Sequence, residues 1–180
     1  MKELSLNILD IAKNSVTAGA SRIEITVTEM PSRLTISVRD NGCGMTAEFV
    51  AQVTDPFTTT RTTRKVGLGI PLLQMEARMA GGDLSIESAV GQGTTVTAWF
   101  DPRNIDMPPL GDLSSSVVTL IQGSPDIDFL FAHQVGEERY TLDTREIREI
   151  MGGISLAEPE VLDWLAGFLT ENESTLEGKR

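Results

Sequence analysis

The 180-residue chain is 40% hydrophobic, which supports a packed core and excludes wholesale disorder. Its single cysteine, Cys43, excludes an internal disulfide framework, and no apolar run approaches the roughly 20 residues of a membrane span, so we expect a cytoplasmic protein without membrane association. The formal net charge of −11 is concentrated in residues 101–180, which carry 6 basic and 16 acidic residues against 9 and 10 in residues 1–100, and such acidity excludes nucleic-acid binding.

The first hundred residues show clear hydrophobic periodicity. Some segments have apolar residues at helical spacing, such as Leu4, Ile8 and Ile11. Between them lie short segments in which every second residue is apolar, as in a half-buried strand. In chain order, the pattern predicts a helix over 4–18, strands over 22–29 and 33–39, a short helix over 46–53, a polar loop over 55–69, a helix over 70–80, and strands over 83–88 and 94–100.

A proline-rich segment over 102–112 coincides with the change in charge, and we interpret it as a linker. It separates a domain over 1–101 from a small acidic α/β unit over 113–180. The second unit is predicted to contain a helix from Asp112, strands over 127–131 and 138–142, a helix over 144–151, a helix that Pro159 opens, and a frayed tail over 171–180. We expect the only histidine, His133, to have a structural role.

The first of four informative segments is LDIAKNSVTAGA (9–20). On a helix, Asn7, Asp10 and Asn14 share one polar stripe with apolar neighbours on both sides. Such a stripe is costly unless its groups find partners. One interpretation is a solvated face or helix–helix hydrogen bonds. The other is a metal–phosphate site, because an Asn oxygen is a good Mg²⁺ ligand and a carboxylate one turn earlier can polarise a hydroxyl.

Three further segments are each ambiguous. In VRDNGCGM (38–45), Asp40 precedes two closely spaced glycines, which is consistent with an ordinary Asn-Gly hairpin turn. RKVGLGIPLL (64–73) is a glycine-containing loop that enters a helix, an arrangement that can cradle an anion. GQGTTVTAW (91–99) places Thr94 at the start of a strand, where threonine is also simply a good strand former.

The order of these segments resembles the GHKL superfamily, named after gyrase, Hsp90, histidine kinases and MutL. KNSVTAGA is similar to the ENSLDAGA-like segments of MutL proteins, and DPFTTT resembles the PFxTT stretch that precedes the lid in kinase members. The resemblance covers roughly residues 4–101. It implies an α+β fold, a Bergerat-type two-layer α/β sandwich with a mixed sheet, to which the C-terminal unit is appended.

The resemblance also implies ATP and Mg²⁺ as cofactors. Asp40 would accept a hydrogen bond from the adenine amino group, with support from Thr94. Gly42 and Gly44 would let the backbone approach the purine, and on this interpretation a flat ligand, rather than the fold, requires two glycines there. Asn14 would hold Mg²⁺ against the phosphates.

The remaining assignments concern the phosphates and the reaction. Gly67, Leu68 and Gly69 would form part of the lid and meet the phosphates, and Lys65 either adds positive charge there or is a solvated loop residue. Two positions depart from the family pattern. The general base is usually Glu, but here it is Asp10, one methylene shorter, and Lys65 stands where kinase members often have the first glycine of the lid motif. The shorter base favours slow hydrolysis or transfer to a hydroxyl that reaches closer.

We expect neither a sensor histidine kinase, because nine residues before Asp10 leave no room for a phosphoacceptor hairpin, nor a gyrase- or MutL-type transducer. The first hypothesis is therefore a regulator similar to anti-sigma-factor serine kinases, which transfers phosphate to a partner protein or clamps it. The alternatives are a non-catalytic ATP sensor and a slow ATPase without a protein substrate. The acidic unit would be a partner surface or the cap of a homodimer. The whole chain also resembles small ATP-binding proteins encoded near hydrogenase-type genes in anaerobic bacteria, which implies a cytoplasmic redox setting.

Overall fold

Alternating apolar side chains build the centre of a mixed sheet. The computed structural model describes residues 3–55 and 68–180. Strand β1 (Arg22–Met30) pairs antiparallel with β2 (Arg33–Asp40), β2 pairs antiparallel with β4 (Gly93–Phe100), and β4 pairs antiparallel with the edge strand β3 (Asp83–Ala89). Strands β1, β2 and β4 bury alternate side chains over most of their length, as the period-two pattern predicts, whereas the edge strand β3 buries only Leu84.

The C-terminal segment extends this same sheet. Strand β5 (Asp128–Val135) runs parallel to β1, and β6 (Glu138–Asp143) pairs antiparallel with β5, so the strand order is β3-β4-β2-β1-β5-β6. One apolar cluster continues from Ile23 and Ile25 on β1 to Phe129 and Phe131 on β5. Residues 113–180 therefore share the sheet and the core of the preceding residues.

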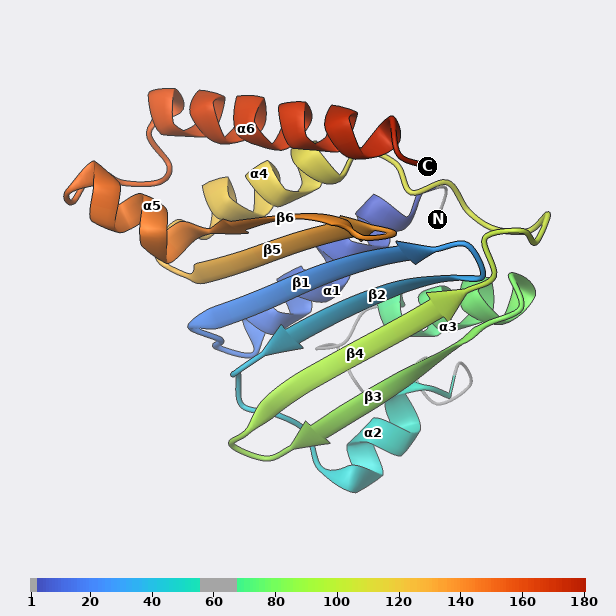
Figure 1. The fold of residues 1–180 in the computed structure, drawn as a ribbon. Coiled ribbons are helices and arrows are strands. Elements are labelled where there is room, and N and C mark those ends of the chain that lie inside the picture. Colours follow the sequence, from blue (N-terminus) through green and yellow to red (C-terminus); the bar gives the residue numbers. More distant parts are fainter. Residues whose placement is uncertain (1–2, 56–67) are drawn as a thin grey trace.

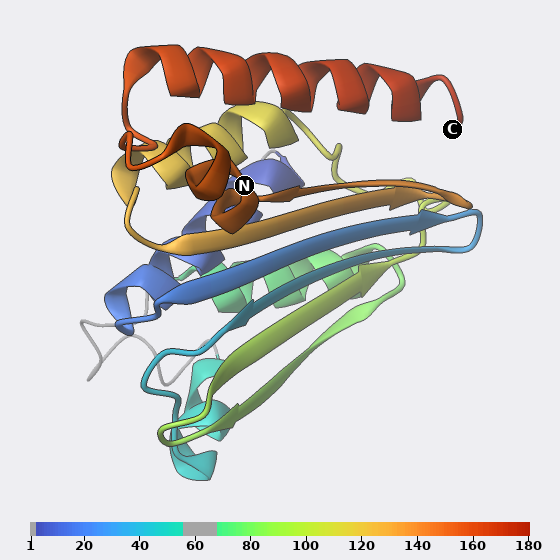
Figure 2. The ribbon, with the colours of Figure 1, turned by 60° about the vertical axis from the view of Figure 1, so that its left-hand side comes forward.

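The helices form a second layer behind the sheet (Figures 1 and 2), and α5 lies near one end of β5. Helix α1 is central, because α3 packs on one side of it and α4 on the other, and α6 packs against α4. Their bounds are α1 Leu4–Thr17, α2 Ala47–Val53, α3 Gly69–Met79, α4 Leu113–Gly123, α5 Thr144–Met151 and α6 Pro159–Glu177. In the described part of the chain, no helix is both long and apolar enough to cross a membrane.

The predicted fold class is confirmed, since this arrangement is the two-layer α+β architecture with a mixed sheet. Most element boundaries fall within a residue or two of the predicted ones, and the side chains of Thr46 and Asp143 cap α2 and α5 as N-caps. Most of the predicted 55–69 loop lies outside the described residues.

The frayed tail over 171–180 is a wrong prediction. Helix α6 continues to Glu177. Two contacts hold its last turns: the side chain of Leu176 is buried, and Glu173 forms a hydrogen bond to a buried histidine. Residues 171–180 are mostly polar, and a single leucine among them is too little to show the apolar spacing that predicts a helix.

That histidine, His133, joins the two halves of the sheet. Its ring is fully buried and bonds Glu29 of β1 through Nε2 at 2.8 Å and Glu173 of α6 through Nδ1 at 2.7 Å. Tyr140 donates a hydrogen bond to Glu173, and Arg180 pairs with Glu29. Burial alone would lower the pKa of His133, but the hydrogen bonds that its ring makes to the carboxylates of Glu173 and Glu29 outweigh burial and raise that pKa above its usual 6.5.

This network predicts a pH-dependent stability. Because the pKa of His133 is higher in the folded than in the unfolded chain, its contribution is complete below pH 6.5 and is lost as the pH rises through the folded pKa. Urea unfolding at a series of pH values should show the wild-type free energy of unfolding falling across that window. His133→Gln should be less stable at pH 6 by up to about 3 kcal/mol and nearly flat with pH. An equal pH slope in both proteins would contradict this role.

Candidate functional site

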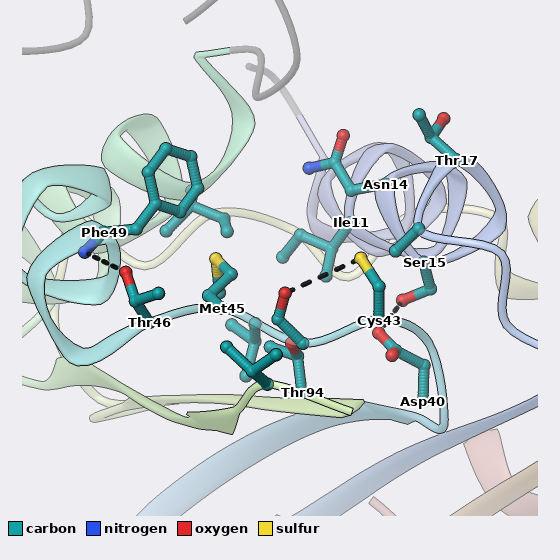
Figure 3. A pocket seen from close by; sticks show the side chains of 15 residues that line it. Ile11, Asn14, Ser15, Thr17, Asp40, Cys43, Met45, Thr46, Phe49 and Thr94 are labelled. Carbon is teal, nitrogen blue, oxygen red and sulfur yellow. Dashed lines mark hydrogen bonds between the residues drawn. The ribbon is translucent and has the colours of Figure 1, made fainter. Parts of the chain in front are cut away.

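A cavity of about 480 Å³ opens between the helix layer and one end of the sheet. Figure 3 shows side chains of α1 on one side, Phe49 of α2 on the other, and Asp40 and Thr94 on the strands below. Its wall is mainly apolar, which suits a flat aromatic ligand with a few polar groups. The lining residues are Ile11, Asn14, Ser15, Thr17, Ala18, Asp40, Cys43, Gly44, Met45, Thr46, Phe49, Ile70, Val90, Thr94 and Val96.

Asp40 is the charged group on the floor of this cavity. Strand alternation places it on the same face as Leu34 and Val38, so an aspartate occupies a position of the core series and is only 8% exposed. Its Oδ2 accepts a hydrogen bond from Ser15 Oγ at 2.5 Å, and its Oδ1 accepts one from the Gly42 amide at 2.8 Å. The carboxylate is thereby held in one orientation at the cavity surface.

Ser15 is a site residue that the sequence analysis did not identify. It lies one turn after Ile11 on α1, so helical spacing alone directs it toward the cavity, and it is buried beside Asp40. The signal that could have found it is its place directly after Asn14 on the face that turns toward the sheet. The sequence does not show that α1 packs against the end of β2, and without that contact Ser15 cannot be told from any other small residue of a helix.

The two glycines after Asp40 have a structural reason, which corrects the interpretation that only a ligand requires them. A Cβ on Gly42 would lie 2.9 Å from both Cβ and the carbonyl oxygen of Ala18. Gly44 has φ +70°, and a Cβ there would lie 1.9 Å from the Ala89 carbonyl oxygen. The chain's own backbone therefore excludes side chains at both positions, whatever the cavity binds.

Thr94 lies directly opposite Asp40 in the β2–β4 register, and both line the cavity. Its hydroxyl is 2.8 Å from Ser88 Oγ, which also donates to the Gly93 carbonyl and accepts from the Met45 amide. Ser88 thus fixes the loop after β2 to the end of β4, and it orients Thr94 beside the cavity.

The polar stripe of α1 divides between two roles. Asn7 is buried and donates to Glu76 of α3 at 2.7 Å, as the helix–helix alternative predicts. Asn14 lines the cavity, and its side chain forms no hydrogen bond with any residue of the described ranges. Asp10 is exposed between them, beside Gly69 at the start of α3, where a Cβ on Gly69 would lie 3.5 Å from Asp10 Cβ.

The remaining predicted residues lie near this rim or outside the described chain. Leu68 is the exposed residue before α3, and Gly69 begins the helix next to the cavity residue Ile70. Lys65 and Gly67 fall outside the described residues. Within the described ranges, no group of three or more His, Cys, Asp or Glu side chains is arranged to hold a metal ion.

The glycine geometry gives a prediction about stability. Gly44→Ala should lower the free energy of unfolding by more than about 2 kcal/mol, because it combines a left-handed backbone with a 1.9 Å contact. The matched control is Gly91→Ala, which has φ +76° but nothing within 4 Å of the added Cβ and should cost only about 1 kcal/mol. Thermal and urea unfolding measure both. Equal losses of stability in the two variants would show that the Ala89 carbonyl does not prevent a side chain at position 44.

Comparison with known proteins places this geometry in a family. The chain is 37% identical over 98 residues to the signal transduction histidine-protein kinase AtoS of Escherichia coli, which covers 54% of this chain and 16% of AtoS. It is 33% identical over 92 residues to sporulation kinase D of Bacillus subtilis, covering 50% of this chain and 18% of that kinase, and 31% identical over 109 residues to the B. subtilis sensor histidine kinase YkoH, covering 58% and 23%. The chain thus spans less than a quarter of the length of each of these relatives.

The match to a family model lies in the part of the chain that forms the cavity. The model of the histidine kinase-, DNA gyrase B- and HSP90-like ATPase family matches residues 1–104, which include α1, the Asp40 strand, the start of α3 and Thr94. That match covers more than half of the sequence and contains every residue of the cavity described above. The chain therefore belongs to the histidine kinase-, DNA gyrase B- and HSP90-like ATPase family.

Proposed function

We propose that the protein binds ATP in the α1–β2 cavity and uses it to phosphorylate or clamp a partner protein. The observation that carries the proposal is the oriented Asp40 carboxylate on the floor of an apolar cavity. Ser15 and the Gly42 amide each occupy part of its acceptor capacity, and a carboxylate has room for a further donor. An adenine amino group supplies such a donor, while Ile11, Met45 and Phe49 offer apolar surface to the ring.

The triphosphate is proposed to run from the cavity toward the start of α3. The unpaired amide groups at a helix N-terminus favour anions, and α3 begins with Gly69 beside Asp10. Asn14 is the side chain that would hold Mg²⁺, as one amide-oxygen ligand beside phosphate oxygens. The bound ion would neutralise phosphate charge, and Asn14 would fix its place relative to Asp10 one turn earlier.

For phosphotransfer, Asp10 is proposed to accept the proton of an attacking hydroxyl. The hydroxyl oxygen forms a bond to the γ-phosphorus, the bond from that phosphorus to the β–γ bridging oxygen breaks, and ADP leaves. Asp10 is exposed, so a hydroxyl from outside the chain can reach it. Its short side chain favours an acceptor that is held close.

An apolar stripe on α3 supports a protein as the source of that hydroxyl. Leu68, Met75 and Met79 are each more than half exposed, and they follow one another at helical spacing along the same face of α3. Exposed large apolar residues grouped in this way are typical of protein contact sites. The stripe begins one residue before Gly69, which lies against Asp10, so a partner seated on it is brought beside the reacting end of the nucleotide.

The binding part of the proposal predicts a loss with Asp40→Asn. Replacing the carboxylate should weaken ATP binding about tenfold to a hundredfold, because a charged hydrogen bond is lost and the amide presents a donor to the adenine amino group. Calorimetric titration with ATP and Mg²⁺ measures the effect. Asp106→Asn, on the exposed segment before α4, is the matched control and should bind as wild type. No ATP binding by the wild type, or equal affinity of both variants, would refute the assignment.

The proposed role of Asp10 as a base predicts that ATP binding and phosphate transfer can be separated by mutation. Asp10→Asn should leave ATP affinity within about twofold and abolish transfer of labelled phosphate to candidate partner proteins, since the amide cannot accept the proton. Autoradiography of reactions with each partner measures transfer. If partner binding still depends on ATP while neither wild type nor variant labels a protein, the chain is an ATP sensor. Label released only as free phosphate would instead indicate a slow ATPase.

A further inference from the structure

A half-exposed tryptophan, Trp164, lies on α6, which forms the margin of the molecule opposite α2 (Figure 1). Trp164 is 49% exposed, an unusual state for the largest side chain on a surface helix. Its ring stacks on Phe168, with centroids 5.4 Å apart and planes inclined by 17°, and Phe168 meets Tyr140 edge to face at 6.2 Å. These contacts hold the indole in one orientation while half of its surface stays in water.

Acidic residues lie before and after Trp164 along α6. Glu160 lies one turn before Trp164 and Glu171 two turns after it on the same helix face, and Asp163 is its neighbour in sequence. All three are exposed, and none forms an ion pair within the described part of the chain. The sequence from 149 to 178 contains no lysine or arginine, so no basic side chain of α6 neutralises them. We call these residues, Glu160, Asp163, Trp164 and Glu171, the α6 acidic face.

Gly167 is an exposed position on α6 with open space around it. It lies one turn after Trp164, and a Cβ built on it would meet no atom within 4 Å. Gly167 has no backbone reason for being glycine, since its φ is not positive, and inside a helix a glycine costs stability relative to alanine.

We propose that the α6 acidic face binds an arginine-rich segment of a protein partner. A guanidinium group stacks on an indole face and forms paired hydrogen bonds with carboxylates, so arginine matches both features of the face at once. A preoriented aromatic ring is also the kind of residue on which binding energy concentrates. The charge excludes a second copy of this chain through the same face, and it excludes nucleic acid or anionic lipid, because each would oppose negative charge to negative charge.

This surface is separate from the nucleotide proposal. Helix α6 packs mainly against α4 and β6, and Glu173 reaches His133 of β5, whereas the cavity lies between α1, α2 and the β2–β4 end of the sheet. Binding at the α6 acidic face is therefore expected with and without ATP. If the chain fails to bind ATP, the proposal for the α6 acidic face still stands. If the α6 acidic face fails to bind the arginine peptide, the proposal for the cavity still stands.

The test uses the full chain and a fluorescent peptide of alternating arginine and alanine, with a glutamate–alanine peptide of equal length as the negative probe. Fluorescence anisotropy measures affinity, and ¹⁵N spectra follow the two indole N–H signals. We expect the arginine peptide to bind and to shift the Trp164 signal. The Trp99 signal should stay in place, because that ring lies on β4 and is covered by Arg33 of β2. A shift of Trp99 alone, or no binding up to about 1 mM, overturns the proposal.

Matched variants separate this face from general negative charge. Trp164→Leu keeps an apolar contact with Phe168 and should weaken the peptide about tenfold, as should Glu160→Lys with Glu171→Lys. The control pair, Glu87→Lys with Asp106→Lys, changes the net charge by the same amount at exposed sites away from α6. It should weaken peptide binding less than about threefold. Equal weakening by both charge pairs would show bulk attraction only and overturn the proposal. Should a variant misfold, the indole shifts of the wild-type chain still decide it.

Discussion

The site depends on one constraint, which is that the charge of Asp40 must be stabilised although β2 carries it on the core face of the sheet. Burial of a carboxylate is costly unless hydrogen bonds replace the lost water. Ser15 supplies one from α1, and the Gly42 amide supplies another from the turn after β2. Those two bonds tie the first helix, the second strand and the following loop together, and the same bonds aim the carboxylate at the cavity. The contacts that hold the local structure are thus the same ones that orient Asp40 for the proposed recognition of adenine.

Much of this could be predicted from sequence because it rests on local patterns. Period-two alternation located the central strands and helical spacing located α1 and α3, and the starts of α2 and α5 coincide with residues that cap helices well, Thr46 and Asp143. The candidate site residues Asp40, Asn14 and Thr94 also came from short motifs in a characteristic order. The structure brings these three residues to one cavity from three separate elements.

What could not be predicted depends on contacts between distant segments. Ser15 gains its role only when α1 lies over the end of β2, and the need for Gly42 and Gly44 appears only when Ala18 and Ala89 approach them. The parallel pairing of β5 with β1 leaves no local signature, so residues 113–180 looked like an appendage although they complete the sheet. In the same way, α6 continues past residue 171 because Glu173 reaches His133, forty residues earlier in the chain.

The central claim is that the Asp40 carboxylate recognises the amino group of adenine. Calorimetric titration of the wild-type chain with ATP, with purine riboside triphosphate and with GTP tests it most directly, since the three ligands differ at the purine edge. Purine riboside triphosphate lacks the 6-amino group and should bind about tenfold to a hundredfold more weakly than ATP. GTP should bind more weakly still, because its 6-oxo group faces the carboxylate. Equal affinity for all three nucleotides would contradict the account.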